Sequence, residues 1–210
     1  FDLKQNYKNE DFYVNKSNFF AFNLIDSWPR WEKNILNIYG EKYCGKTHLS
    51  NIFKKKYRAF TVKSGEFTSK NLKDFKLAEN LILDNFDEKI DENLMYTLFN
   101  IADQDNKYIL INSLKPINEL NLKLTDLKSR AKNCLFAKIE KPDDELMFAI
   151  LLKNFSDRQI TVEKKLIDFI IKHIDRSYGK IYEFIYKIDE ISLKKKKSID
   201  FKIIKETLKV

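Results

Sequence analysis

The segment from Gly40 to Thr47 constrains the fold of this chain more than any other. It reads Gly-Glu-Lys-Tyr-Cys-Gly-Lys-Thr and matches G-x-x-x-x-G-K-[ST] at every fixed position. A strand-like apolar run at residues 34–39 precedes it, and a helical pattern at residues 47–56 follows it. In this context the backbone N–H groups of the loop and the N-terminus of the helix face an anion. The motif therefore predicts a phosphate-binding loop in an α/β domain.

Four residues of the motif have defined chemical roles. Gly40 and Gly45 allow the backbone to turn so that its N–H groups point at an anion. Lys46 is expected to reach the β- and γ-phosphates of a nucleotide, and Thr47 to bind Mg²⁺ through its hydroxyl. The chain has only four glycines. Two of them at the fixed positions favour nucleotide binding over an ordinary structural turn.

Two neighbouring residues carry weaker signals. Cys44 occupies a variable position of the loop and is interpreted as a tolerated small residue. His48 begins the helix and is interpreted as a packing residue rather than a catalytic one. Both are included in the candidate binding loop.

A phosphate-binding loop also needs an acidic residue that holds Mg²⁺ through water. The apolar run at residues 80–83 ends in Asp84 and Asn85, so we predict that Asp84 has this role. An ordinary Asp–Asn turn is the alternative. Many P-loop ATPases carry a carboxylate at the position of Asn85, and an amide cannot act as that base. Hydrolysis of ATP by this chain alone is therefore expected to be weak or absent.

Two further polar positions follow predicted elements. Asn112 ends the next strand, where its amide could approach a γ-phosphate. Arg130 ends the phrase Thr-Asp-Leu-Lys-Ser-Arg on a short predicted helix. In a ring or dimer of P-loop proteins, an arginine here can project onto the nucleotide of a neighbour and neutralise developing charge. The spacing by itself favours a surface arginine.

Strand and helix patterns alternate through the first two thirds of the chain. Strand-length apolar runs occur at residues 34–39, 59–62, 80–83, 108–112 and 135–139. Helical patterns stand between them at residues 47–56 and 92–102. Such alternation predicts an α/β fold with a parallel sheet and crossover helices on its faces.

The pattern changes after Lys141. Pro142 and the acidic residues that follow it are typical of a helix start. Helical periodicity then marks residues 143–154, 162–173, 178–192 and 201–208, with no evident strand. We predict an α/β nucleotide-binding domain at residues 1–141 and a small all-helical domain at residues 142–210.

Composition excludes several classes of protein. Two cysteines cannot make a disulfide framework or a cysteine-rich metal site, and with only two histidines a histidine-based zinc site is improbable. No apolar stretch approaches the length of a membrane helix, and the N-terminus is polar, without an apolar signal region. We therefore expect a cytoplasmic protein without a membrane partner.

The formal net charge of +8 leaves two interpretations open. Only five of the 39 basic residues are arginine, the side chain that grips phosphate or guanine with a planar fork. Solvated helix ends and turns explain most of the lysines, and a phosphate-contacting patch is the alternative. Contact with DNA is therefore possible on charge grounds but has no specific signal.

Several phrases together resemble the DnaA family of AAA+ proteins. They are Asp-Phe-Tyr-Val (11–14) followed by Ser17 and Asn18, Ile-Asp-Ser-Trp-Pro (25–29), the P-loop continued by His48 and Leu49, Leu-Asp-Asn (83–85) and Asp-Leu-Lys-Ser-Arg (126–130). The resemblance extends from about residue 8 to the C-terminus and is nearest to the short Hda branch, which regulates the initiator DnaA. It implies an AAA+ P-loop core followed by a helical lid. The chain length leaves no room for the helix-turn-helix domain of DnaA.

The resemblance also implies roles for individual residues. Lys46, Thr47 and Asp84 match the phosphate and Mg²⁺ positions of the family, with ADP or ATP as the nucleotide. Arg130 matches its arginine finger, and Val14 lies in the segment that covers the adenine. The implied partners are ATP-bound DnaA and the sliding clamp of DNA polymerase, and the implied activity is to promote hydrolysis of ATP on DnaA. A homodimer that hides Arg130 and a monomer both stay open.

The chain departs from the family pattern at two places. The arginine of the family's lid helix aligns with Gly179, with Lys180 and Arg176 as its possible substitutes. The clamp-binding peptide of the family begins with glutamine, whereas this chain opens with Phe-Asp-Leu, which could be the end of such a peptide. The absence of an initiator methionine indicates a trimmed chain.

Two other functions stay open on the sequence. One is an ATPase of the helicase-loader type that binds single-stranded DNA, against which Asn85 and the scarcity of arginine count. The other is a P-loop phosphotransferase acting on a small molecule, for which no acceptor site or arginine-rich lid is evident.

Overall fold

The computed structural model describes residues 12–158, 160, 162–195 and 199–208. The described chain divides into two compact units. The first comprises residues 12–40 and 45–139, and the second joins Glu41–Cys44 to the residues from Glu140 onward. That these units are separate domains with a boundary near residue 141 stays a prediction.

The first unit is built on a five-stranded sheet in which all paired strands are parallel. The strands are β1 (Ile35–Tyr39), β2 (Ala59–Lys63), β3 (Asn80–Phe86), β4 (Tyr108–Ser113) and β5 (Leu135–Lys138). Their order is β2-β3-β4-β1-β5. The P-loop strand β1 thus lies between β4 and β5, and the carboxyl ends of β1, β3 and β4 meet at one edge of the sheet.

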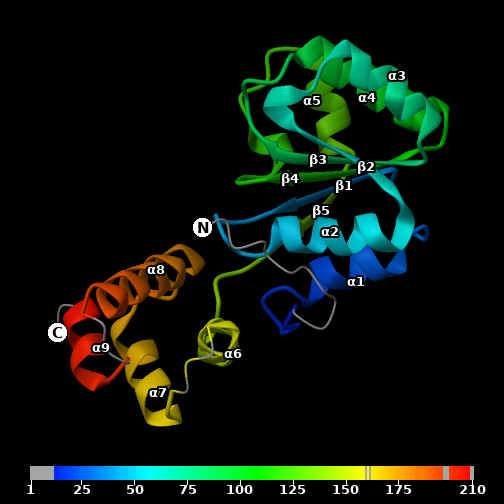
Figure 1. Ribbon diagram of the computed structural model, residues 1–210. Helices are drawn as coiled ribbons and strands as arrows, with labels where there is room; N and C mark the ends of the chain where they lie inside the picture. The colour runs from blue at the N-terminus through cyan, green and yellow to red at the C-terminus, as the bar shows by residue number, and fades with distance from the viewer. Residues whose placement is uncertain (1–11, 159, 161, 196–198, 209–210) are drawn as a thin grey trace. The chain divides into compact units, whose positions relative to one another are not determined.

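Helices cover both faces of this sheet (Figure 1). On one face lie α1 (Phe19–Ser27) and α2 (Lys46–Tyr57), and on the other lie α3 (Ser69–Leu77), α4 (Glu92–Gln104) and α5 (Thr125–Lys132). Two short 3-10 turns, η2 (Ser64–Glu66) and η3 (Ile117–Glu119), follow β2 and β4. Because both faces are covered, β1, β3 and β4 are almost continuously buried.

The described part of the second unit consists of four helices and loop segments. Its helices are α6 (Asp144–Asp157), α7 (Lys164–His173), α8 (Tyr178–Lys195) and α9 (Phe201–Leu208). Asp143 caps α6, accepting a hydrogen bond from the backbone N–H of Leu146 at 2.9 Å, as an acid at a helix start should. Apolar residues of all four helices form one core, which includes the fully buried Leu151, Ile170 and Ile188.

The predicted α/β fold with a parallel sheet and alternating helices is confirmed. The helices α1 and α3 were not predicted. The segment Phe-Phe-Ala-Phe-Asn-Leu-Ile-Asp-Ser of α1 is apolar on most sides, so it lacks a clear helical stripe. The sequence of α3 is short and mostly polar, and Phe75 alone is buried in it.

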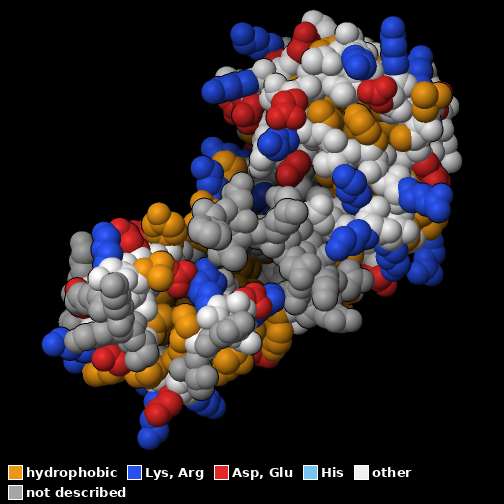
Figure 2. All heavy atoms as spheres, viewed as in Figure 1, with side chains coloured by type: hydrophobic (Ala, Val, Ile, Leu, Met, Phe, Trp, Pro, Cys, Tyr) orange, Lys and Arg blue, Asp and Glu red, His pale blue; other side chains and the backbone are white. Residues whose placement is uncertain are grey.

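On the face shown in Figure 2, acidic side chains lie among the basic ones on both units. This distribution gives no support on that face to a phosphate-contacting patch. Within the described residues, no helix combines the length and apolar character needed to cross a membrane.

Candidate nucleotide site

The P-loop turns at a position that strongly favours glycine. Gly45 stands immediately before α2 with φ of 99°, in the left-handed region. A Cβ atom at this position would lie 3.0 Å from a ring carbon of Phe12. Both the backbone conformation and this close approach therefore disfavour a side chain here.

Lys46 is the first residue of α2. Its Nζ donates a hydrogen bond to the carbonyl oxygen of Gly40 at 2.7 Å. The ammonium group is thus held next to the start of its own loop, at the carboxyl end of β1, where a phosphate cradled by the loop would meet it.

Four side chains from three elements meet at this edge of the sheet. Thr47 Oγ1 donates to Asp84 Oδ2 at 3.3 Å. Asn112 Nδ2 donates to the other carboxylate oxygen, Asp84 Oδ1, at 2.8 Å and to Ser50 Oγ at 2.7 Å. The predicted residues Thr47, Asp84 and Asn112 are therefore brought together, and Ser50 is a member that sequence reasoning missed.

The side chain of Asp84 is oriented by a local irregularity of β3. The pairing of β3 with β4 shifts register between Leu83 and Phe86. Asn85 within this shift has φ of 55°, a left-handed conformation that asparagine tolerates. Its backbone N–H donates to Asp84 Oδ1 at 3.1 Å, and its own side chain is exposed.

A buried amide beneath the loop links β1 to β4. Asn37 is fully buried, and its Nδ2 donates to the carbonyl of Ile111 at 3.1 Å and to Ser113 Oγ at 2.8 Å. Its Oδ1 accepts from the backbone N–H of Ile117 at 3.0 Å. Sequence reasoning missed this residue, although a lone asparagine inside an apolar strand was its signal.

Aromatic side chains support the start of α2. Phe12 stacks on Phe22 with centroids 6.0 Å apart and meets the edge of His48 at 5.3 Å. His48 thus packs in this cluster, and Val14, two residues beyond Phe12, is half-buried. The structure brings the segment proposed to cover the base close to the P-loop helix.

The variable positions of the P-loop belong to the second compact unit. Glu41 accepts hydrogen bonds from Ser177 Oγ at 3.0 Å and from the backbone N–H of Tyr178 at 2.6 Å, so it caps α8. Cys44 is buried. Tyr178 is buried near it, and its own burial raises the pKa of its phenol well above the usual value. The neutral phenol donates to the carbonyl of Glu140 at 3.1 Å.

The candidate substitutes for the lid arginine both contact acids within the second unit. Lys180 Nζ donates to Glu183 at 3.1 Å. Arg176 forms a two-pronged pair with Asp144 at 2.9 and 3.0 Å. Gly179, which aligns with the arginine of the family, lies in the first turn of α8.

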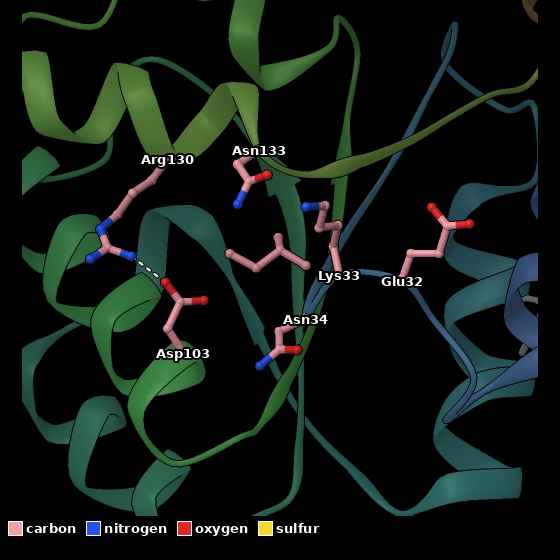
Figure 3. Close-up of a pocket in the computed structure, with 7 residues that line it drawn as sticks. Glu32, Lys33, Asn34, Asp103, Arg130 and Asn133 are labelled. Carbon is pink, nitrogen blue, oxygen red and sulfur yellow. Dashed lines mark hydrogen bonds and ion pairs between the residues drawn. The ribbon is translucent and has the colours of Figure 1, made fainter.

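Arg130 lies far from the P-loop, in a polar pocket of about 180 Å³ (Figure 3). Its guanidinium pairs with Asp103 and lies 5.4 Å from the ring centroid of Tyr96. The pocket includes Asn34 and Ile35, where β1 begins, whereas Gly40 follows its end. At ~3.3 Å per strand residue, roughly 15 Å separates these two edges of the sheet, so the structure does not bring Arg130 to the P-loop residues.

The oxygen atoms at the P-loop edge suit Mg²⁺ held together with a nucleotide. Among the described residues, no group of three His, Cys, Asp or Glu side chains could hold a metal ion without further ligands. The hydroxyl of Thr47 and the carboxylate of Asp84 are hard oxygen donors, already 3.3 Å apart. Mg²⁺ bound here would supply neutralisation of phosphate charge.

Comparison with curated proteins relates the whole chain to replication initiators. The chain is 26% identical over 234 residues to the chromosomal replication initiator DnaA of Treponema denticola, covering 99% of this chain and 50% of the relative. It is 28% identical over 238 residues to DnaA of Borrelia turicatae, covering 98% and 49%. The chain is thus similar over nearly its whole length to part of DnaA. It spans about half the length of these relatives, and no family model matches it.

Solved structures share the fold at lower sequence identity. Domain III of DnaA from Thermotoga maritima superposes with a TM-score of 0.79 at 22% identity, over 100% of this chain and 98% of that one. A structure of DnaA bound to AMPPCP and single-stranded DNA gives 0.72 at 20% identity, over 93% and 70%. The RuvB branch migration motor of Thermotoga maritima gives 0.62 at 14%, over 84% and 61%. The chain therefore has the fold of domain III of DnaA and of the RuvB motor.

Proposed function

We propose that this chain is an adenine-nucleotide-binding regulator of replication initiation, of the Hda type, that promotes hydrolysis of ATP bound to DnaA. The observation that carries the proposal is the separation of two sets of groups. Thr47, Asp84 and Asn112, which are proposed to face phosphate and Mg²⁺, lie at the carboxyl edge of the sheet, and Arg130 lies at the opposite edge. One molecule can then bind a nucleotide and present an arginine to another.

The P-loop edge supports binding of ADP or ATP with Mg²⁺. Gly45 has the backbone conformation that the loop requires, and Lys46 lies at the mouth of the loop. Thr47 and Asp84 form a hydroxyl–carboxylate pair next to it. A homologous initiator has been solved with AMPPCP, an ATP analogue, which favours an adenine nucleotide here.

Arg130 supports an action on a partner rather than on the chain's own nucleotide. Its side chain is about one third exposed, and it lies in the last turn of the short helix α5. A guanidinium that reaches the phosphates of a neighbouring nucleotide would stabilise the negative charge that develops on them. DnaA and the sliding clamp are the partners that the resemblance implies.

The test is hydrolysis of ATP pre-bound to the cognate DnaA in the presence of clamp-loaded DNA. We expect the full-length protein to accelerate phosphate release and Arg130→Ala to abolish the acceleration, since arginine fingers contribute about a thousandfold or more where they act. ADP binding by Arg130→Ala, measured by calorimetry, should match the wild type.

The matched control is Arg30→Ala, which removes an exposed arginine of the first unit and should retain the acceleration. No acceleration by the wild type, with ADP still bound tightly, would refute the regulatory function. Loss of folding in Arg130→Ala would instead indicate a structural role for the pair with Asp103.

A second candidate is the initiator function itself. It is favoured by the names of the curated relatives, which are DnaA proteins covered over about half their length, and by the structure of an initiator on single-stranded DNA. Nucleotide-dependent binding of single-stranded DNA by this protein, without any effect on ATP hydrolysis by DnaA, would favour this candidate.

A further inference from the structure

The hydrogen bonds at the P-loop edge form a network, here called the circuit, that starts and ends on α2 and passes through β3 and β4. Thr47 and Ser50 are the two members from α2, and they lie one turn apart on the same face of the helix. Thr47 contacts one oxygen of Asp84, Asn112 contacts the other, and Asn112 returns to Ser50. The circuit holds the ends of two strands against the helix that follows the P-loop.

Burial makes the orientation of the amide in this circuit decisive. Asn112 is fully buried and Ser50 is 4% exposed. A carboxylate only accepts hydrogen bonds, so the amide nitrogen of Asn112 must face Asp84. The second N–H of the same nitrogen donates to Ser50 Oγ. Both N–H groups therefore have fixed acceptors, and the amide cannot rotate without leaving a buried donor unpaired.

The two acceptors of Asn112, Asp84 and Ser50, differ in their exposure to solvent. Asp84 is half-buried at the end of β3, beside the exposed Thr47, on the side where phosphates and Mg²⁺ are proposed to bind. Ser50 lies behind the amide, in the interior. An anion at the open side can compete with Asp84 for one N–H of Asn112, whereas the N–H held by Ser50 stays out of its reach.

We propose that Ser50 is a positioning residue that anchors one N–H of Asn112 so that the other is presented to the terminal phosphate of a bound nucleotide. The inference rests on the proposed binding of adenine nucleotides. It makes Ser50 a determinant of the preference between nucleoside triphosphate and diphosphate, because only the triphosphate has the additional group that Asn112 would contact.

The experiment compares the affinities of the full chain for AMPPCP and ADP by calorimetry in the presence of Mg²⁺. We expect Ser50→Ala to weaken binding of AMPPCP about five to ten times more than binding of ADP, the effect of one misplaced hydrogen bond. In an Asn112→Ala background, adding Ser50→Ala should change the ratio of the two affinities no further, since the effect passes through Asn112.

Two further comparisons separate the hydroxyl of Ser50 from its volume. Ser50→Thr keeps a hydroxyl and should retain the ratio, whereas Ser50→Val has a similar shape without one and should lose it. These two variants show whether the Ser50 hydroxyl sets the ratio of affinities even if Ser50→Ala does not fold. Ser64→Ala, the control, removes another buried serine hydroxyl, which follows the edge strand β2, and should leave the ratio as in the wild type.

The inference would be overturned if Ser50→Ala lost the same affinity for AMPPCP as for ADP. It would also be overturned if Ser50→Thr and Ser50→Val had the same ratio of AMPPCP affinity to ADP affinity. An additive effect in the double variant would do the same. If the wild type binds neither nucleotide, the proposed function fails first, and this outcome is distinct from a wild type that binds both while Ser50 makes no difference.

Discussion

Among single residues, Lys46 offers the most direct test of the candidate site. Its Nζ lies 2.7 Å from the carbonyl oxygen of Gly40, at the mouth of the loop. Lys46→Ala removes a charged donor, so we expect ADP to bind about ten to a hundred times more weakly. Calorimetry measures the loss, with Lys42→Ala as the control because Lys42 is an exposed lysine of the same loop. Unchanged affinity in Lys46→Ala would contradict the site.

Gly45 is the residue at which backbone strain decides stability. Gly45→Ala would place a side chain at φ of 99° and within 3.0 Å of Phe12, so we expect the free energy of unfolding to fall by about 1–2 kcal/mol or more. Denaturant unfolding measures the change. A Cβ at Gly65 would contact nothing within 4 Å, so Gly65→Ala is the control and should change stability little. Equal effects of the two substitutions would show that Gly45 is not under this constraint.

At the scale of secondary structure elements, one carboxylate of α4 fixes the start of α5. Glu92, the first residue of α4, accepts hydrogen bonds from the backbone N–H of Leu124 at 2.6 Å and of Lys123 at 2.8 Å. These bonds lower the pKa of Glu92, the bond from Leu124 most. Since Arg130 lies in the last turn of the same short helix, Glu92 helps to determine where that arginine lies.

The pH dependence of stability tests this contact. A carboxyl whose pKa is lowered by folding stabilises the native state above its ordinary pKa of about 4.5, and the contribution disappears as the pH falls through the lowered value. We therefore expect Glu92→Gln to be less stable than the wild type at neutral pH, with a difference that shrinks below about pH 4.5. Unfolding measured between acid and neutral pH gives the curve. The control is Glu119→Gln, at an exposed carboxylate. A stability difference between Glu92→Gln and the wild type that stays constant with pH, or an equally large difference for Glu119→Gln, would show that the Glu92 carboxylate is not its cause.

At the scale of the whole molecule, the arrangement of the first unit predicts a poor ATPase. Asn85 cannot accept a proton from an attacking water at neutral pH. Arg130 stands at the other edge of the sheet, roughly 15 Å away by strand length, so it cannot assist its own P-loop. We expect phosphate release from ATP by the isolated protein to remain near background in a steady-state assay. Brisk release that Lys46→Ala abolishes would show that this chain is an ATPase in its own right.

Local sequence patterns were sufficient for the fold class, and they marked the motif that we propose as a phosphate-binding loop. Apolar runs bounded by turn residues marked the five strands, most clearly β1, β3 and β4, because burial on both faces favours continuous apolar residues. The motif marked Gly45, Lys46 and Thr47, because left-handed backbone and phosphate contact each demand a particular residue type. The helices α1 and α3 were missed, since one is apolar on most sides and the other buries Phe75 alone.

The sequence by itself determined the five strands, most of the helices and the position of the motif proposed to hold a phosphate, since these depend on neighbouring residues. Only the tertiary structure decided the strand order, and with it which distant side chains meet. Asn112 contacts Ser50 across 62 positions of the chain and Asp84 across 28. Glu92 reaches the start of α5 across 32. Such contacts leave no local signal, because they exist only once the strands pair and the helices pack on the sheet.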